Sequence, residues 1–240
     1  MMHDIHCHLT SKEYENPDKI LNECKKKDIS AILNGLDYED NIKVLELSKN
    51  HSNAYAAIGM HPSNNFDKRI INQIISNEKK IIAIGEVGLD FKKKFSSKQI
   101  INFKKIISLA QNLKKPLIIH LRNAEKEIIE LTKNLEVPSV LHCFCGKKKL
   151  ISKANNYFSI PANIIYSEQF KLLAREVPIE KIMCETDSPY LFKEFPNTPL
   201  NVKHAYSEIA KIKGITLKQS ISKISLNVKK AFKINGFKNN

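Results

Sequence analysis

The chain contains no tryptophan, and its five cysteines follow no pattern that indicates disulfides or a thiolate metal site. Their number is odd, and no two of them have the CxxC spacing that is typical of cysteine zinc sites. We therefore expect free thiols in a reducing compartment. Cys145 is the cysteine expected to lie near a candidate site. The five are Cys7, Cys24, Cys143, Cys145 and Cys184.

Long apolar runs are also missing. No segment approaches the ~18 consecutive apolar residues that cross a bilayer. The first residues, MMHDIHCHL, already carry candidate ligands, which leaves no room for the basic start and apolar stretch of a signal peptide. These absences predict a soluble, cytoplasmic protein that does not associate with membranes. We expect a monomer with no obligate protein partner.

Positive charge exceeds negative charge by a wide margin. The chain has 39 Lys and Arg against 25 Asp and Glu, a net charge of +14, which suits an anionic partner such as nucleic acid. Most of the excess is scattered lysine in a chain rich in Ile and Asn, so a biased genome composition explains it equally well. The short run Lys92–Lys94 lies between Phe91 and Phe95. Charge supports nucleic-acid binding without establishing it.

Short β-rich apolar segments alternate with longer amphipathic ones along the whole chain. Each short segment is bounded by turn residues, as expected for a parallel strand that is buried on both faces. The eight segments begin at Asp4, Ile29, Ala54, Ile81, Pro116, Ser139, Tyr157 and Ile182.

The amphipathic segments have helical spacing. In KQIINFKKIISLAQNL, for example, Ile100, Phe103 and Ile107 recur at steps of three and four residues. Two helical stretches, 200–213 and 216–234, follow the last strand.

Eight strand–helix units in 240 residues predict an α/β fold, a single closed (β/α)8 TIM barrel. An open doubly wound sheet is the alternative, but so many strands in so short a chain favour closure. We expect residues 1–236 to form one domain and residues 237–240 a short tail.

Ionisable residues fall at the carboxyl ends of the predicted strands. These ends converge on one face of a barrel, where the active sites of this fold lie. Residues that are far apart in sequence therefore meet in one cleft. They are His6, His8, His61, Glu86, His120, Arg122, His142 and Asp187.

The His6-x-His8 spacing has a physical meaning on a strand. Side chains alternate between faces, so residues two apart point the same way and can bind one ion, while Cys7 points outward. A lone histidine is more often a hydrogen-bonded structural residue. Four histidines and two carboxylates at strand ends instead indicate coordinated metal.

The candidate ligands are imidazoles and carboxylates, a set that suits Zn²⁺, Mn²⁺, Fe²⁺ or Co²⁺ and, in a carboxylate-rich subsite, Mg²⁺. Six ligands are too many for one tetrahedral ion that keeps an open position. We predict two divalent ions that share Glu86 as a bridging carboxylate. Such pairs, about 3.5–4 Å apart, lower the pKa of a water and stabilise the leaving oxygen in phosphoester cleavage. The six are His6, His8, Glu86, His120, His142 and Asp187.

Six motifs in register resemble the TatD family of metal-dependent deoxyribonucleases: DIHCHL, GMHP, GEVGLD, HLRNA, HCFCG and ETDSPYL. The resemblance runs from Asp4 to about Phe232. It implies an amidohydrolase-type barrel that cleaves DNA phosphodiesters with Mg²⁺, Mn²⁺ or Zn²⁺. Leu121 and Cys145 depart from the family pattern without removing a ligand.

The resemblance also implies how the ligands are divided between the ions. Glu86 is shared, and the other five ligands fall into two sets, with His6, His8 and Asp187 on one ion and His120 and His142 on the other.

Hydrolysis by a metal-activated water is the predicted reaction, with Asp187 and Glu86 as catalytic residues and Asp187 receiving the proton of the water. Arg122 is predicted to bind a phosphate oxygen, although a salt bridge at the barrel rim explains it equally well. His61 is predicted to contact substrate, with a structural loop histidine as the alternative. Glu185 is predicted to be one of the substrate-binding residues, and its carboxylate is also expected to orient a histidine ligand.

Binding of DNA is predicted to be independent of sequence, through Lys and Arg on the rim that meet the phosphate backbone. Because the chain has no tryptophan, the candidates for base stacking are Tyr190, Phe91 and Phe144, and the two phenylalanines are equally explained as core.

Two other functions compete with a nuclease. The same metal site serves ester or amide hydrolysis, for example the removal of an amino acid from tRNA, and the sequence discriminates poorly between these reactions. A non-catalytic binding barrel is the second alternative. It predicts loss of ligands, yet all six are present.

Overall fold

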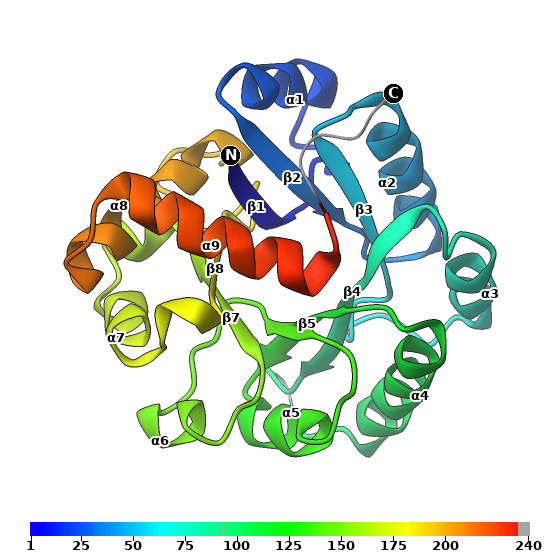
Figure 1. Ribbon diagram of the computed structural model, residues 1–240. Helices are drawn as coiled ribbons and strands as arrows, with labels where there is room; N and C mark the ends of the chain where they lie inside the picture. The colour runs from blue at the N-terminus through cyan, green and yellow to red at the C-terminus, as the bar shows by residue number, and fades with distance from the viewer. Residues whose placement is uncertain (93, 235–240) are drawn as a thin grey trace.

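Eight parallel strands, each hydrogen-bonded to the next in sequence, form the centre of the computed structural model, which describes residues 1–92 and 94–234 (Figure 1). Every predicted strand is present. The strands are β1 (Met2–Cys7), β2 (Ile29–Asn34), β3 (Ala54–Ile58), β4 (Ile81–Asp90), β5 (Leu117–Arg122), β6 (Ser139–Leu141), β7 (Tyr157–Pro161) and β8 (Ile182–Glu185). The predicted tail 237–240, the domain end at 236 and the middle of the 92–94 lysine run lie outside the described residues.

The first and last strands approach each other, so the sheet curls into a nearly closed barrel. The His8 amide donates to the Ser188 carbonyl at 2.8 Å, and the Asp187 amide donates to the His6 carbonyl at 2.9 Å. The predicted TIM barrel is therefore confirmed, and the open doubly wound sheet is excluded.

Helices surround the barrel (Figure 1). Six of them begin at a residue whose side chain accepts a hydrogen bond from a backbone N–H of the first turn, which is the usual reason for a helix to start there. The helices are α1 (Pro17–Lys26), α2 (Tyr38–Asn50), α3 (Lys68–Ser76), α4 (Ser97–Leu113), α5 (Glu125–Thr132), α6 (Lys148–Ile151), α7 (Glu168–Glu176), α8 (Val202–Lys213) and α9 (Leu217–Phe232), with 3-10 turns η1 (Ala162–Ile165), η2 (Ile179–Lys181) and η3 (Pro199–Asn201).

Strand side chains divide into two separate cores. Outward-facing residues such as Leu33 and Cys7 pack under the helices, as predicted for Cys7. Inward-facing residues such as Ile32, Ile118 and Met183 fill the barrel. This division explains why the strands read as continuous apolar runs.

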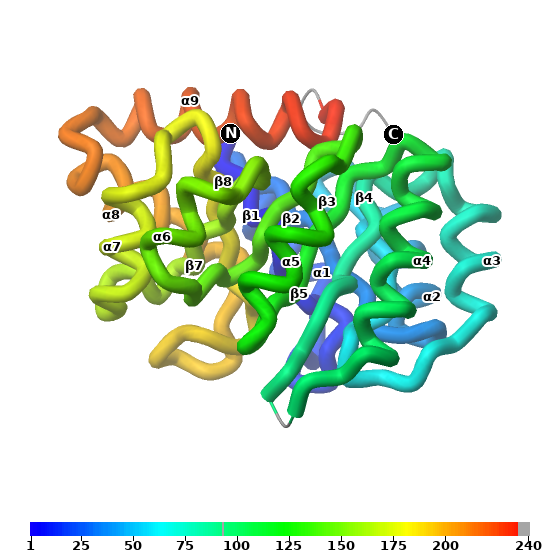
Figure 2. Tube along the Cα trace, turned by 90° about the horizontal axis from the view of Figure 1, so that it is seen from below, coloured from blue at the N-terminus to red at the C-terminus, as the bar shows by residue number. Residues whose placement is uncertain are grey.

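Helix α9 closes one end of the barrel. It crosses the amino-terminal ends of the strands in Figure 1 and lies along one edge of the molecule in Figure 2. Its residues Val228, Ala231 and Phe232 join the inner core. The chemistry of the barrel is thus left to the opposite, carboxyl-terminal face.

His3 ties β1 to this closing helix. Its Nδ1 lies 2.6 Å from Ser30 Oγ on β2, and its Nε2 lies 3.0 Å from Ser225 Oγ on α9. Burial lowers the pKa of His3 from the usual 6.5 to about 4. The folded protein therefore holds His3 neutral at a pH where the unfolded chain protonates it.

We expect acid to destabilise the metal-free protein through this residue. Between pH 6.5 and about 4 the unfolded state binds one more proton at His3 than the folded state, so the free energy of unfolding falls as pH falls. The loss is on the order of 3 kcal/mol across this window. Urea unfolding in EDTA at several pH values should show a shallower pH dependence for His3→Gln than for the unchanged protein. Equal slopes would contradict this role.

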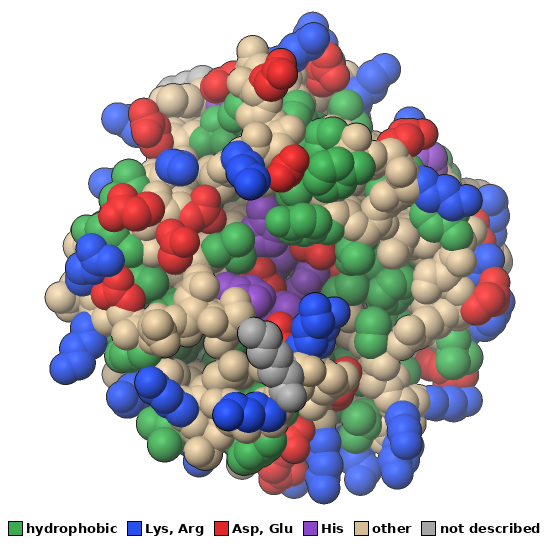
Figure 3. All heavy atoms as spheres, turned by 180° about the vertical axis from the view of Figure 1, so that it is seen from behind, with side chains coloured by type: hydrophobic (Ala, Val, Ile, Leu, Met, Phe, Trp, Pro, Cys, Tyr) green, Lys and Arg blue, Asp and Glu red, His purple; other side chains and the backbone are tan. Residues whose placement is uncertain are grey.

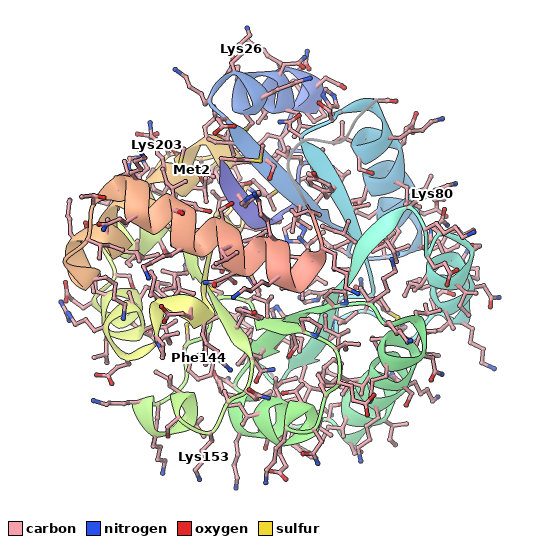
Figure 4. The ribbon with its side chains drawn as sticks, viewed as in Figure 1. Met2, Lys26, Lys80, Phe144, Lys153 and Lys203 are labelled. Atoms are coloured by element: carbon pink, nitrogen blue, oxygen red, sulfur yellow. The ribbon has the colours of Figure 1, made fainter. Side chains whose placement is uncertain are left out.

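The excess charge is spread around the outside of the molecule. Figure 4 shows Lys26, Lys80, Lys153 and Lys203 at the outer edge, beside different helices.

The described cysteines are free; Cys7, Cys24 and Cys184 are buried, and Cys145 is exposed. Among the described residues, no helix is both long enough and apolar enough to cross a membrane.

Candidate metal centre

The two histidines of β1 point at the same place. Their Nε2 atoms lie 3.1 Å apart. The His8 Nδ1 donates to the Asn34 carbonyl at 2.9 Å, which leaves the lone pair of a neutral His8 on Nε2. The pairing of β1 with β2 shifts register between Asp4 and Cys7, so the irregularity falls at the end of the strand that carries the two histidines.

Two carboxylates complete the first cluster. Glu86 Oε2 lies 3.4 Å from both His6 Nε2 and His8 Nε2, and Asp187 Oδ1 lies 3.5 Å from both. Four ligands bound tetrahedrally at 2.0–2.1 Å lie roughly 3.3–3.4 Å from each other. Buried donor atoms at this spacing fit a divalent cation, which would offset their mutual repulsion.

The second cluster faces the other oxygen of Glu86. The Oε1 atom lies 2.7 Å from His120 Nδ1, 3.8 Å from His61 Nε2 and 4.0 Å from His142 Nε2. His142 Nε2 is also 4.0 Å from Asp187 Oδ1. Glu86 therefore lies between two groups of histidines, which is the position that the sequence predicted for a bridging carboxylate.

His61 lies nearer to Glu86 than the sequence suggested. The structure groups it with Glu86 and His120, and its ring packs 4.5 Å from the ring of His120. Its Nδ1 accepts the Ser63 backbone N–H at 3.2 Å, and burial lowers its pKa to about 4. A neutral His61 thus carries its proton on Nε2, the nitrogen that faces the site.

Glu185 lies behind the metal centre. It is fully buried, and its Oε2 accepts from His142 Nδ1 at 2.8 Å while its Oε1 accepts the Cys143 amide at 3.0 Å. The Ser159 hydroxyl also donates to it. These contacts orient His142 and leave Glu185 without access to a substrate.

Asp90 also belongs to the site, although it was not predicted from the sequence. Its Oδ2 lies 3.3 Å from His120 Nε2, and its Oδ1 accepts the Lys92 amide at 2.8 Å. The 2.7 Å contact of His120 Nδ1 with Glu86 Oε1 holds the ring, and Asp90 lies on its other side. The signal was available, because Asp90 lies four residues after Glu86 on the same strand and so on the same face.

The electrostatics of the centre favour a bound cation. Burial alone would raise the pKa of Glu86, but the neighbouring imidazoles of His6 and His120 lower it well below its usual value. Nearby carboxylates overcome the effect of burial at His8 and His142 and raise their pKa values to about 9 and about 10. Metal binding must displace these protons, so metal affinity should weaken in acid.

The centre opens into a pocket of about 530 Å³ on the carboxyl-terminal face. Figure 3 shows histidine side chains within a hollow there. Arg122 lines the pocket, and among the described residues it forms no ion pair. Tyr190 also lines it and is half exposed, whereas Phe91 and Phe144 are buried in the core.

Buried clusters of histidine and carboxylate at the carboxyl-terminal mouth of such a barrel define a metal-dependent hydrolase of the amidohydrolase type, with residues suited to a binuclear centre. The chain belongs to the TatD related DNase family, which matches residues 3–233.

Relatives in this family are similar over nearly their whole length. The chain is 36% identical over 240 residues to an uncharacterized metal-dependent hydrolase of Methanocaldococcus jannaschii, with 96% of each protein covered. It is 31% identical over 258 residues to Deoxyribonuclease TATDN3 of Homo sapiens, with 95% of this chain and 93% of that protein covered.

Solved structures have the same fold. The TatD homologue YJJV of Escherichia coli superposes with a TM-score of 0.87 at 19% identity and covers 98% of each chain. A TatD family hydrolase of Entamoeba histolytica gives a TM-score of 0.83 at 22% identity, over 96% of this chain and 97% of that one.

Proposed function

We propose that the protein is a deoxyribonuclease that hydrolyses DNA phosphodiester bonds with two divalent cations, Mg²⁺, Mn²⁺ or Zn²⁺. The position of Glu86 carries the proposal, because its two oxygens face different groups of histidines within one pocket. Cations held at the two groups would lower the pKa of an attacking water and offset the charge that develops on the leaving oxygen. The name of the human relative, a deoxyribonuclease, supports this choice of substrate.

The ligand histidines are held in position by the groups behind them. Glu185 fixes His142 through a hydrogen bond, and Glu86 itself holds His120 at 2.7 Å with Asp90 close to the other nitrogen of that ring. A centre built in this way loses little entropy when it binds metal and substrate.

Proton transfer is assigned to Asp187. Its Oδ1 faces the histidines of the first cluster, and its side chain lines the pocket. We assign the proton of the attacking water to its other oxygen, Oδ2, whose carboxylate is kept ionised because the charge of His142 and hydrogen bonding to His8 outweigh burial and lower its pKa.

Substrate binding is assigned to Arg122 and His61. The guanidinium of Arg122, which forms no ion pair with a described residue, can hold two oxygens of a phosphate. His61 carries its proton on the nitrogen that faces the pocket, so it donates a hydrogen bond to a phosphate oxygen. Both contacts follow the backbone of DNA and carry no sequence information.

The test uses metal-stripped protein, end-labelled single- and double-stranded DNA, and added Mg²⁺, Mn²⁺ or Zn²⁺. We expect metal-dependent cleavage that His142→Ala abolishes and that His51→Ala, a change outside the site, leaves intact. Two bound metals per chain without cleavage under any condition would refute the deoxyribonuclease. Carboxylic ester and aminoacyl-tRNA substrates would then identify the ester hydrolase instead.

A further inference from the structure

Two cysteines lie just beyond the candidate metal ligand that follows β6. Cys143 and Cys145 come directly after His142, and Phe144 between them is buried against the ring of Phe158. Cys143 is partly buried and Cys145 is exposed, whereas the other three cysteines are buried. Among the described cysteines, an oxidant in solution therefore reaches this pair first.

The two thiols contact each other. The Cys145 Sγ lies 3.3 Å from the carbonyl oxygen of Cys143, so the second side chain folds back toward the first cysteine. A hydrogen bond from the Cys143 thiol lowers the pKa of Cys145 and raises the pKa of Cys143. Because the sulfurs already face each other, a disulfide between them needs only a small movement of the backbone.

The pair is joined to the metal centre through Glu185. The Cys143 amide donates to Glu185 Oε1 at 3.0 Å, and the other oxygen of Glu185 accepts from His142 Nδ1 at 2.8 Å. Cys143 has φ +50°, a left-handed conformation that residues with a Cβ seldom adopt. A change in this bend would therefore act on the carboxylate that orients His142.

The surroundings of the pair are held in place. The Cys145 carbonyl accepts a hydrogen bond from the Gln169 side chain at 2.8 Å, and Phe144 packs in the outer core. Bonded sulfurs lie about 2.05 Å apart, which is nearer than two hydrogen-bonded thiols. We therefore expect the closing bond to move Cys143 and to disturb its hydrogen bond with Glu185.

We propose that Cys143 and Cys145 form a reversible disulfide that weakens metal binding at His142. The oxidant is a low-molecular-weight disulfide such as oxidised glutathione. The Cys145 thiolate attacks one of its sulfurs, which breaks the S–S bond and releases one glutathione thiolate. The Cys143 thiolate then attacks the Cys145 sulfur and releases the second. The two cysteine protons pass to the departing thiolates, so the cysteines are oxidised and the small disulfide is reduced.

Charge next to the pair suits such an oxidant. Residues 147–149 are three exposed lysines, and they attract a small disulfide that carries carboxylates. In a reducing compartment, disulfides of this kind are usually transient and sense oxidants. The inference goes beyond the proposed function, because it concerns control of the metal centre and not the substrate.

The test exposes the protein to oxidised glutathione at neutral pH, removes the glutathione and alkylates the remaining thiols. Trypsin releases residues 134–147 as one peptide, which contains Cys143 and Cys145 and no other cysteine. We expect mass spectrometry to show that this peptide has lost two hydrogens and resists alkylation until it is reduced. Competition with a chromogenic chelator should show that the oxidised protein binds Zn²⁺ at least about tenfold more weakly.

Cys145→Ser is the matched control, because it keeps a polar group of similar size that cannot form the bond. It should bind Zn²⁺ as tightly as the reduced protein, with and without oxidant. Alkylation of both cysteines after oxidation, or a mixed disulfide with glutathione that persists on Cys145, would overturn the proposal. A Cys143–Cys145 disulfide with unaltered Zn²⁺ affinity would overturn it as well. Neither measurement involves DNA, so failure of the proposed deoxyribonuclease is detected separately.

Discussion

Glu86→Gln is expected to slow hydrolysis of both DNA and bis(p-nitrophenyl) phosphate by about 10³-fold or more. Glutamine has the same shape but no charge, and it offers an oxygen to only one of the two histidine groups that Glu86 faces. Metal analysis after dialysis should therefore find fewer than two ions per chain.

The matched control is Glu130→Gln, the same change on the exposed surface of α5. It should retain full activity and full metal content. A Glu86→Gln protein that keeps two metals and near-normal turnover would exclude a bridging role for this carboxylate.

Gly88→Ala is expected to lower the free energy of unfolding by about 3 kcal/mol or more. Gly88 has φ +144°, a conformation that side chains rarely adopt, and a Cβ there would lie 2.0 Å from the carbonyl oxygen of His120. That oxygen belongs to the backbone of the neighbouring strand and cannot move away. The change should also displace His120 and weaken the second cluster.

Gly214→Ala separates crowding from backbone conformation. Gly214 also has positive φ, +63°, but a Cβ there meets nothing within 4 Å. It should cost only about 1–2 kcal/mol, the penalty of the left-handed conformation. Chemical denaturation of the two variants makes the comparison. Equal costs would show that the close approach of Gly88 to β5 does not determine stability.

The strands could be predicted from sequence because a strand buried on both faces must be apolar along its whole length. Turn residues then mark its ends, as they do on both sides of β2 and β5. The ends of the helices were predicted less accurately than the strands. The predicted stretch 216–234 ends at Phe232, because Lys233 adopts a left-handed conformation that stops the helix.

The candidate site followed from one rule, that strand ends converge on one face. The rule gave the direction of each side chain but not its depth. Glu185 and Asp187 are two residues apart, yet Glu185 is sealed behind His142 while Asp187 lines the pocket. Depth depends on strand register and on the connections above, neither of which a local pattern contains. For the same reason, the sequence does not predict that His61 lies beside Glu86 and His120.

The aromatic candidates show the same limit. Phe91 and Tyr190 both follow strands, and hydrophobicity does not distinguish them. Phe91 packs into the outer core, whereas Tyr190 is held at the pocket by the Asn197 side chain. Asn197, seven residues after Tyr190, keeps Tyr190 at the pocket, and the local sequence around the two rings does not indicate this contact.

Helix α9, which covers the inner core, affects how ligands reach the metal centre. Val228, Ala231 and Phe232 fill the barrel floor beneath the inner core, and the pocket that contains Glu86 opens on the opposite face. In the proposed deoxyribonuclease, the ions, the water, the DNA strand and the product would share this opening. A bound strand would then cover the ions beneath it, so we expect the metal centre to be loaded before the strand binds.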